Sequence, residues 1–183
     1  AKLYLPTGLK SGESIKISTP FMVKIPSGDI SRLGHVGQSY QITQWYPKPA
    51  VYDKNGWHQM PYLNQGEFYS EYGSFDVKIT LPDNYVVGST GDLQGDEEKN
   101  FLKAKSVETQ SFLNGPEQKT RPKNEFPPSS TTTKTLHYKQ SKVHDFAWFA
   151  DKRYLVLQDE VELPHSKRMV TTYVMFTPRN ANL

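Results

Sequence analysis

Short runs of alternating apolar and polar residues, separated by Pro, Gly, Asn and Asp, constrain the fold of this chain more than any other feature. The cleanest run is residues 75–81, which places Phe75, Val77, Ile79 and Leu81 on one face of a strand. Similar runs recur about every 8–12 residues, which is the strand spacing of an all-β sandwich or barrel. The sequence therefore predicts a mostly β fold of about nine or ten short strands.

Other parts of the sequence predict further strands, a hairpin turn and a loop. Residues 3–5, 13–18 and 21–26 predict an opening β-meander. Lys-Asn-Gly at residues 54–56 predicts a hairpin turn, because Asn and Gly both accept positive φ. Four prolines and few apolar residues between 115 and 133 predict an exposed, mobile loop.

One short helix is predicted after residue 95. Asp96 resembles an N-cap, and two glutamates follow it in the first turn. Apolar residues then recur at helical intervals, with Phe101, Ala104, Val107 and Phe112 forming the predicted buried face, in which Glu108 is an alternative to Val107.

The composition excludes several classes of protein. The 183 residues suffice for one domain with a core, and the aromatic share of 13% compensates for an apolar share of only 36%. The net charge of +3 comes from interspersed charges, without the basic face of a nucleic-acid-binding protein. There is no cysteine, no apolar run long enough for a membrane span, and no signal peptide. Because the chain starts with Ala1, we expect it to be a segment of a longer protein.

Catalytic motifs are sparse. The histidines lack His-Glu-x-x-His spacing, so no metal site is predicted. His144-Asp145 could be a catalytic dyad, but no Gly-x-Ser-x-Gly elbow accompanies it, and a turn into a buried aromatic strand is the favoured interpretation. Asp53 with Glu67 or Glu71 could form paired carboxylates, and surface roles are favoured there too.

Aromatic residues gather between positions 45 and 72. The members are Trp45, Tyr46, Tyr52, Trp57, Tyr62, Phe68, Tyr69 and Tyr72. Such a cluster serves either as a platform for carbohydrate or peptide or as core and domain-interface packing, and composition alone favours packing.

A resemblance to a known family is carried by six blocks that occur in a fixed order. They are Thr-Gln-Trp-Tyr-Pro-Lys-Pro-Ala-Val-Tyr-Asp at 43–53, Gly-Trp-His at 56–58, Gly-Glu-Phe-Tyr at 66–69, residues 75–82, Val-Gly-Ser-Thr-Gly at 87–91 and His-Asp-Phe-Ala-Trp at 144–148. Over about residues 3–163 they resemble the N-terminal domain of M1-family, aminopeptidase-N-like zinc metallopeptidases, in particular the envelope peptidases of Bacteroidetes-type bacteria.

The resemblance implies a saddle-like β-sandwich at 1–163 that lies against a zinc-binding catalytic domain, with 164–183 as the linker and first strand of that domain. It implies no cofactor in this chain, because the zinc motif and the Gly-x-Met-Glu-Asn loop belong to the catalytic domain, and no Met here precedes Glu. A Thr-Gln-x-Gln segment lines the substrate cleft in that family. Thr43 and Gln44 match its start, and Tyr46 replaces its second Gln.

These implications predict a non-catalytic domain that packs on the catalytic domain of its own parent and lines the cleft for peptide substrate with Gln44 and Tyr46. The parent is expected to be a zinc aminopeptidase of the periplasm or cell envelope. The alternatives are a free-standing carbohydrate- or peptide-binding β-sandwich and a hydrolase in its own right.

Overall fold

The computed structural model describes residues 1–29, 32–61, 63, 69–115 and 125–181. These residues form eleven antiparallel strands, one α-helix and one 3-10 turn, which confirms the mostly β fold with one helix. In chain order the elements are β1 (Gly34–Val36), β2 (Ser39–Ile42), β3 (Val51–Asp53), β4 (Gly56–His58), β5 (Gly73–Pro82), β6 (Val86–Ser89), β7 (Asp92–Gln94), α1 (Asp96–Asn114), β8 (Thr133–Val143), β9 (Trp148–Asp151), β10 (Leu155–Glu162), β11 (Met169–Phe176) and η2 (Pro178–Asn180).

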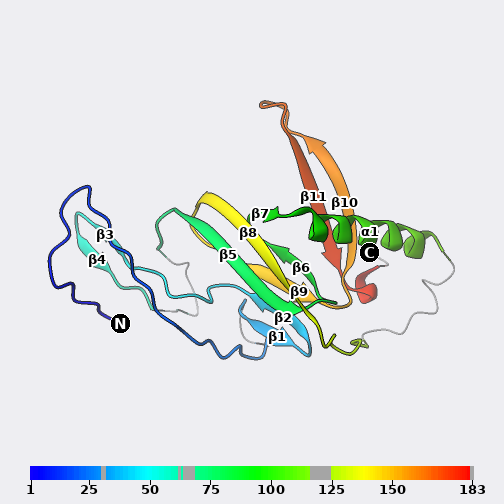
Figure 1. Cartoon of the computed structure of the whole chain (residues 1–183), viewed down its shortest axis with the longest axis horizontal. Helices are drawn as coiled ribbons and strands as arrows, with labels where there is room; N and C mark the ends of the chain where they lie inside the picture. Colours follow the sequence, from blue (N-terminus) through cyan, green and yellow to red (C-terminus); the bar gives the residue numbers. More distant parts are fainter. Residues whose placement is uncertain (30–31, 62, 64–68, 116–124, 182–183) are drawn as a thin grey trace.

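Two sheets enclose the main core (Figure 1). One has the strand order β1-β2-β9-β6 and the other the order β5-β8-β7. Their facing side chains form one cluster, in which Phe146 and Ala150 are fully buried. The remaining buried members come from both sheets and from the turn before β6: Ile79, Tyr85, Val87, Leu136 and Tyr138. Burial of apolar surface between the sheets is therefore what holds them together.

The alternating run at 75–81 forms β5 as predicted. Ile79 is buried, and Val77 and Leu81 are half-buried on the same face, whereas the residues between them are exposed. β8 pairs antiparallel along this strand, with Ile79 opposite Leu136 and Val77 opposite Tyr138. The period of two thus sets both the strand and its orientation.

The predicted helix exists and is 19 residues long, but two details of the prediction are wrong. Gly95, with a φ of 84°, is the N-cap, and Asp96 is the first helical residue. The buried face contains Leu102, Ser106, Thr109 and Phe112, together with Glu98, whereas Ala104 and Val107 are exposed. This face is largely polar because it meets the backbone edge of β10. Thr109 Oγ1 accepts the N–H of Val156 at 2.9 Å, and Ser106 Oγ accepts that of Gln158 at 3.1 Å.

The predicted opening meander is wrong. Residues 1–26 contain no strand, and the nearest pairing is an isolated bridge between Ser27 and His35. Nearly all of these residues are exposed, including Tyr4 and Met22. An alternating pattern shows which face a strand would bury, but a strand also needs a partner edge, and the described residues provide none for this segment.

The predicted loop at 115–133 lies partly outside the described residues. Its described part, residues 125–132, is held by side chains of the sandwich. Asn84 donates to the Pro128 carbonyl at 2.8 Å and accepts the N–H of Ser130 at 3.1 Å. Lys152 donates to Ser129 Oγ at 3.1 Å, and the Arg153 guanidinium lies 3.6 Å from the centre of the Phe126 ring. These contacts replace the apolar anchors that the sequence lacks here.

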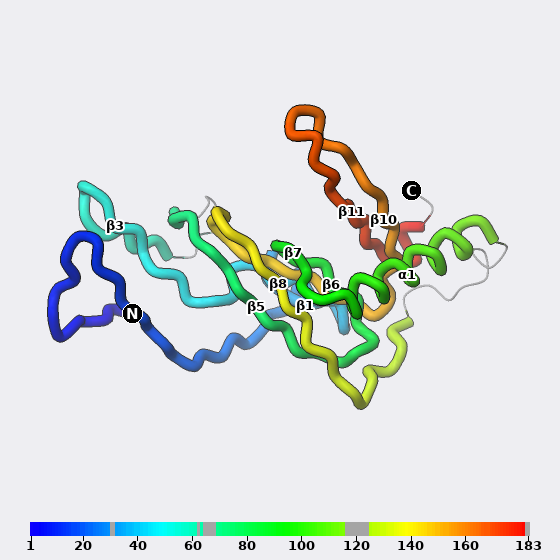
Figure 2. Tube along the Cα trace, turned by 45° about the horizontal axis from the view of Figure 1, so that its top comes forward, coloured from blue at the N-terminus to red at the C-terminus, as the bar shows by residue number. Residues whose placement is uncertain are grey.

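Two projections leave the sandwich (Figure 2). The β3–β4 hairpin and residues 1–25 extend from one end, and the β10–β11 pair, called the β10–β11 arm below, extends from the other side beside α1. β11, which the sequence assigned to a second domain, pairs with β10 along all eight of its residues. The hairpin turn at 54–56 is confirmed, with positive φ at Gly56 only.

We predict that Thr109→Val lowers the free energy of unfolding by about 1–3 kcal/mol, because the substitution keeps the shape of the side chain and leaves the buried N–H of Val156 without an acceptor. Urea denaturation measures this change. The control is Thr80→Val, whose exposed hydroxyl bonds only that of Thr135 and whose loss should stay within about 0.5 kcal/mol. Equal losses in the two variants would contradict this role of α1.

Candidate functional site

The segment 43–48 leaves the end of β2 and is fastened to the turn before β9. The indole N–H of Trp45 donates to the Phe146 carbonyl at 3.1 Å. Pro47 and Pro49 follow and prevent this segment from joining a sheet ladder, as their missing N–H groups predict. The fastening therefore depends on side chains instead of strand pairing.

Asp145 is the centre of this fastening. Its carboxylate accepts the Tyr46 hydroxyl at 3.0 Å and its neighbour's backbone N–H, that of Phe146, at 2.7 Å. The Lys48 ammonium lies 3.0 Å from the same oxygen. His144 is exposed, and its ring contacts Tyr72 at 5.7 Å. His144 thus faces the surface beside Tyr72, whereas Asp145 bonds Tyr46 and the backbone of Phe146. Asp145 therefore supports the turn that leads into the aromatic strand.

Tyr46 lies half-buried among other side chains. Its ring meets Trp45 and Phe75 edge-on, at centroid distances of 5.4 and 5.5 Å. Burial, and next the negative charge of Asp145, raise the pKa of the Tyr46 hydroxyl, so it stays a donor over a wide pH range. The hydroxyl that the sequence left available for a ligand is therefore engaged with Asp145.

Gln44 and Thr43 each carry one energetically unfavourable feature. Gln44 has a φ of 55°, which is uncommon for a residue other than glycine. Thr43 Oγ1 is buried and has no hydrogen-bond partner in the described part of the chain. Strained backbone and unsatisfied polar atoms are costly, and they are concentrated at sites that serve a function.

The aromatic cluster divides into a packed and an exposed half. Trp45 and Tyr46 pack against the main core. Tyr52 and Trp57, opposite each other on the β3–β4 hairpin, are 66% and 65% exposed and have ring centres 4.9 Å apart. Tyr69 and Tyr72 are exposed too, whereas residues 62 and 68 lie outside the described part. Packing and a surface platform therefore each describe part of the cluster.

Asp53 is occupied within its own hairpin. It lies 2.8 Å from His58 Nε2 and accepts the N–H of Asn55 at 2.8 Å. The hydrogen bond with His58 is the main cause that lowers the pKa of this carboxyl. Glu71 is exposed, and Glu67 lies outside the described residues. The described contacts thus give Asp53 a role in the turn, with no paired carboxylate.

No three metal-ligating side chains converge anywhere in the described ranges.

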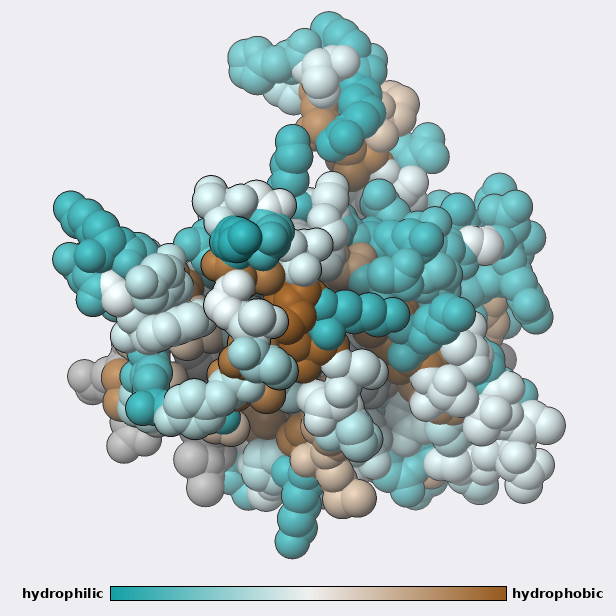
Figure 3. Space-filling view, turned by 60° about the vertical axis from the view of Figure 1, so that its left-hand side comes forward, coloured by the Kyte–Doolittle hydropathy of each residue, from teal (hydrophilic) through white to brown (hydrophobic). Residues whose placement is uncertain are grey.

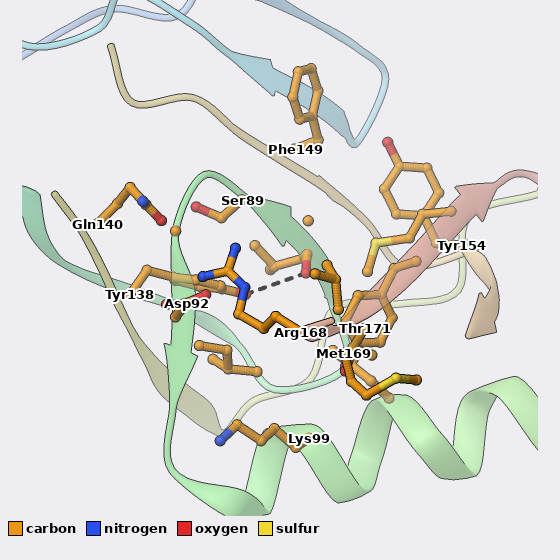
Figure 4. Close-up of a pocket in the computed structure, with 18 residues that line it drawn as sticks. Ser89, Asp92, Lys99, Tyr138, Gln140, Phe149, Tyr154, Arg168, Met169 and Thr171 are labelled. Atoms are coloured by element: carbon orange, nitrogen blue, oxygen red, sulfur yellow. Dashed lines mark hydrogen bonds between the residues drawn. The ribbon is translucent and has the colours of Figure 1, made fainter. Parts of the chain in front are cut away.

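A large hollow that the sequence did not predict lies between the β10–β11 arm, strands β6 and β7, and α1 (Figure 4). Its volume is about 1070 Å³. Lys99 and Arg168 bring positive charge and Asp92 negative charge to its lining, and Tyr138 donates to the Val87 carbonyl at 3.4 Å within it. The lining residues are Val87, Gly88, Ser89, Gly91, Asp92, Leu93, Lys99, Leu102, Tyr138, Gln140, Phe149, Tyr154, Arg168, Met169, Val170, Thr171, Tyr173 and Met175.

Comparison of this chain with protein-family models, with curated proteins and with solved structures finds no match. The family resemblance thus rests on the sequence blocks themselves. In the described residues, α1 is the one helix of membrane-spanning length, and it is too polar to cross a membrane.

We predict that alkaline pH destabilises the chain partly through Tyr46. The unfolded tyrosine loses its proton near pH 10, whereas the folded one keeps it because its pKa is raised. The contribution of Tyr46 to stability is therefore fully present below about pH 10 and is lost as the pH rises through the raised pKa of the folded state. Urea denaturation at pH 8 and pH 11 should show a smaller loss for Tyr46→Phe than for the unchanged chain. Tyr4→Phe, at an exposed position, is the control, and equal losses in all three proteins would contradict the prediction.

Proposed function

We propose that this chain is the non-catalytic N-terminal domain of an M1-like zinc metallopeptidase, which packs on the catalytic domain of its parent and forms one wall of the peptide cleft. The six ordered sequence blocks are the source of this proposal. The mostly β sandwich agrees with the fold that the resemblance implies.

The arrangement of two of these blocks supports the proposal. Residues 43–53 and 144–148 are about a hundred positions apart, yet they meet through the hydrogen bonds of Trp45 and Tyr46 to the 145–146 backbone and carboxylate. A wall residue must hold its position while substrate binds, and hydrogen bonds across the fold provide that rigidity.

The observation that carries the proposal is the unsatisfied hydroxyl of Thr43 beside the left-handed backbone of Gln44. Thr43 and Gln44 match the family's cleft-lining segment. In the described chain Thr43 Oγ1 is the one buried hydroxyl without a hydrogen-bond partner, and Gln44 is one of three residues other than glycine with positive φ, the others being Lys142 and Lys167. A substrate or an adjoining domain could provide the hydrogen-bond partner that the Thr43 hydroxyl lacks. The constrained backbone of Gln44 would hold its side chain in a fixed direction for the same ligand. Tyr46 supports these two residues instead of contacting the ligand through its hydroxyl, because that hydroxyl donates to Asp145.

Exposed apolar side chains support a docked neighbour. Figure 3 shows hydrophobic atoms reaching the surface in the middle of one face. Residues 1–25, the β3–β4 hairpin and the β10–β11 arm all carry large exposed apolar residues, among them Met22, Trp57 and Val174. Surfaces of this kind mark interaction sites, and the proposed neighbour is the catalytic domain of the same polypeptide.

In this proposal zinc belongs to the catalytic domain, where a bound ion activates water and polarises a peptide carbonyl. The residues of this chain bind and orient the peptide. The proposed location is the periplasm or cell envelope, as in the bacterial peptidases that the blocks resemble.

A second candidate function is a free-standing module that binds carbohydrate or peptide. The exposed Tyr52–Trp57 pair favours it, because two flat rings side by side offer a stacking surface. The two candidates differ in what the gene encodes after Leu183.

We predict that the coding sequence contains His-Glu-x-x-His within about 150 residues after Leu183, because the zinc ligands must come from the adjoining domain. Sequencing the complete gene and transcript tests this directly. A stop codon shortly after Leu183 would overturn the proposal and favour the second candidate.

We predict that Gln44→Ala in the complete enzyme changes kcat/KM by about tenfold for some peptide substrates and less for others, because Gln44 lines the pocket for the first substrate side chain. Steady-state kinetics across substrates with different first residues measures this. Thr80→Ala, exposed on β5, is the control. If kcat/KM of Gln44→Ala stayed unchanged for every substrate, Gln44 would have no place in the cleft.

A further inference from the structure

The β3–β4 hairpin stands apart from both sheets of the sandwich (Figure 1). Each of its strands has three residues, and among the described residues the two strands pair only with each other. Val51 is buried at its base, and the His58 ring lies 5.1 Å from that of Tyr69, whereas Lys54 and Asn55 at the tip are exposed. Isolated hairpins of this length are marginally stable, so the tip opens and closes readily.

The tip carries an asparagine followed by a glycine, which is a chemically reactive pair. The carboxamide carbon of an asparagine can form a five-membered ring with the backbone nitrogen of the next residue, and asparagine is among the thermolabile residues for this reason. Gly56 has no Cβ to obstruct its nitrogen, and a Cβ built there would meet no atom within 4 Å. The nitrogen of Gly56 can therefore approach the Asn55 carboxamide without a clash.

The Asn55 side chain is not held in place by the described part of the chain. Its backbone N–H donates to Asp53 Oδ1 at 2.8 Å, but its carboxamide has no hydrogen bond there. Asn84 differs, because its carboxamide donates to the Pro128 carbonyl at 2.8 Å and accepts the N–H of Ser130 at 3.1 Å. The carboxamide of Asn55 can therefore rotate toward the next backbone nitrogen, whereas that of Asn84 is fixed.

A second Asn-Gly pair, Asn114-Gly115, ends helix α1 and is more constrained. The N–H of Gly115 donates to the Phe112 carbonyl at 3.3 Å, and a Cβ built at Gly115 would lie 3.0 Å from the Ser111 carbonyl oxygen. Phe112 is buried and anchors this last turn. The turn must open before the Gly115 nitrogen can react, so the same dipeptide is protected at this position.

We propose that Asn55 is a site of spontaneous covalent modification, at which the Gly56 nitrogen converts the asparagine to aspartate and isoaspartate. The nitrogen loses its proton and bonds to Cγ of Asn55, while the Cγ–Nδ2 bond breaks and ammonia leaves with a proton. Water then opens the cyclic imide. Attack at Cγ gives aspartate, and attack at the main-chain carbonyl carbon gives isoaspartate. No atom is oxidised or reduced, and water is the one co-reactant.

The two products should affect the hairpin differently. Isoaspartate places an extra CH2 group in the main chain of a two-residue turn, which the pairs Asp53–Gly56 and Tyr52–Trp57 follow directly. These pairs cannot keep their register, so the rings of Tyr52 and Trp57, now 4.9 Å apart, should separate. Aspartate keeps the main-chain length and adds only a charge beside Asp53. The modification therefore acts on the exposed aromatic pair, independently of the proposed peptidase domain.

The test uses the unchanged chain, incubated at pH 7 and at pH 9. Peptide mapping by mass spectrometry follows the replacement of NH2 by OH at each asparagine and separates aspartate from isoaspartate. A linear peptide of residues 51–60 gives the rate without the fold. The matched variant is Asn55→Gln, which keeps a carboxamide but would have to form a six-membered ring. NMR measures the ring contact of Tyr52 with Trp57, and Asn55→Asp provides the reference for the aspartate product.

We expect Asn55 to convert within about tenfold of the rate of the linear peptide and at least about tenfold faster than Asn114, because the helical turn adds the cost of its opening to the barrier. The rate should rise from pH 7 to pH 9, since the Gly56 nitrogen must lose its proton. Asn55→Gln should show no conversion at this position. The ring contact should be lost in the isoaspartate fraction and kept in Asn55→Asp.

Three results would overturn the proposal. Conversion of Asn55 more than about tenfold slower than in the linear peptide would show that the hairpin protects it. Conversion of Asn114 at the same rate or faster would show that the hairpin is not the preferred site. An intact Tyr52–Trp57 contact in the isoaspartate fraction would show that the modification leaves the aromatic pair unchanged.

Discussion

The need of every backbone edge for hydrogen-bond partners governs this structure more than any single side chain does. Each strand of the sandwich has N–H and C=O groups that cost free energy when they are buried without a partner. Different parts of the fold provide these partners in different ways. β5 and β8 pair over nearly their full lengths, α1 offers hydroxyls to β10, and side chains such as Asn84 hold residues 125–132. Where no partner exists among the described residues, as at residues 1–26 and the outer edge of β11, the chain leaves apolar surface exposed.

The same constraint bears on the peptidase-domain proposal. The peptidase-domain proposal depends on Thr43 and Gln44, which follow the end of the β2 ladder. The buried hydroxyl of Thr43 has no partner among the described residues, and the backbone of Gln44 is left-handed. There the main core, centred on Phe146, and the contacts of Asp145 hold the surroundings, so that the strained backbone of Gln44 can persist.

Several features were predictable from particular residues. The alternation of Phe75, Val77, Ile79 and Leu81 predicted β5 and its inward face, because side chains on a strand alternate by geometry. Asn55-Gly56 predicted the hairpin turn, although only Gly56 takes positive φ. The helix was predictable in place but not in its buried face, because Ser106 and Thr109 are buried for their hydroxyls, and hydrophobic periodicity does not detect such a role.

By itself the sequence determined the mostly β class, the β5 strand, the hairpin and the position of the helix, since these depend on local periodicity and turn chemistry. The six ordered blocks also named Gln44 and Tyr46 as candidates. Only the tertiary structure decided that Tyr46 gives its hydroxyl to Asp145, that residues 1–26 form no strand, and that a hollow lies between the β10–β11 arm, β6, β7 and α1. These outcomes depend on contacts between residues far apart in the chain, and a local pattern carries no information about which distant partner is present.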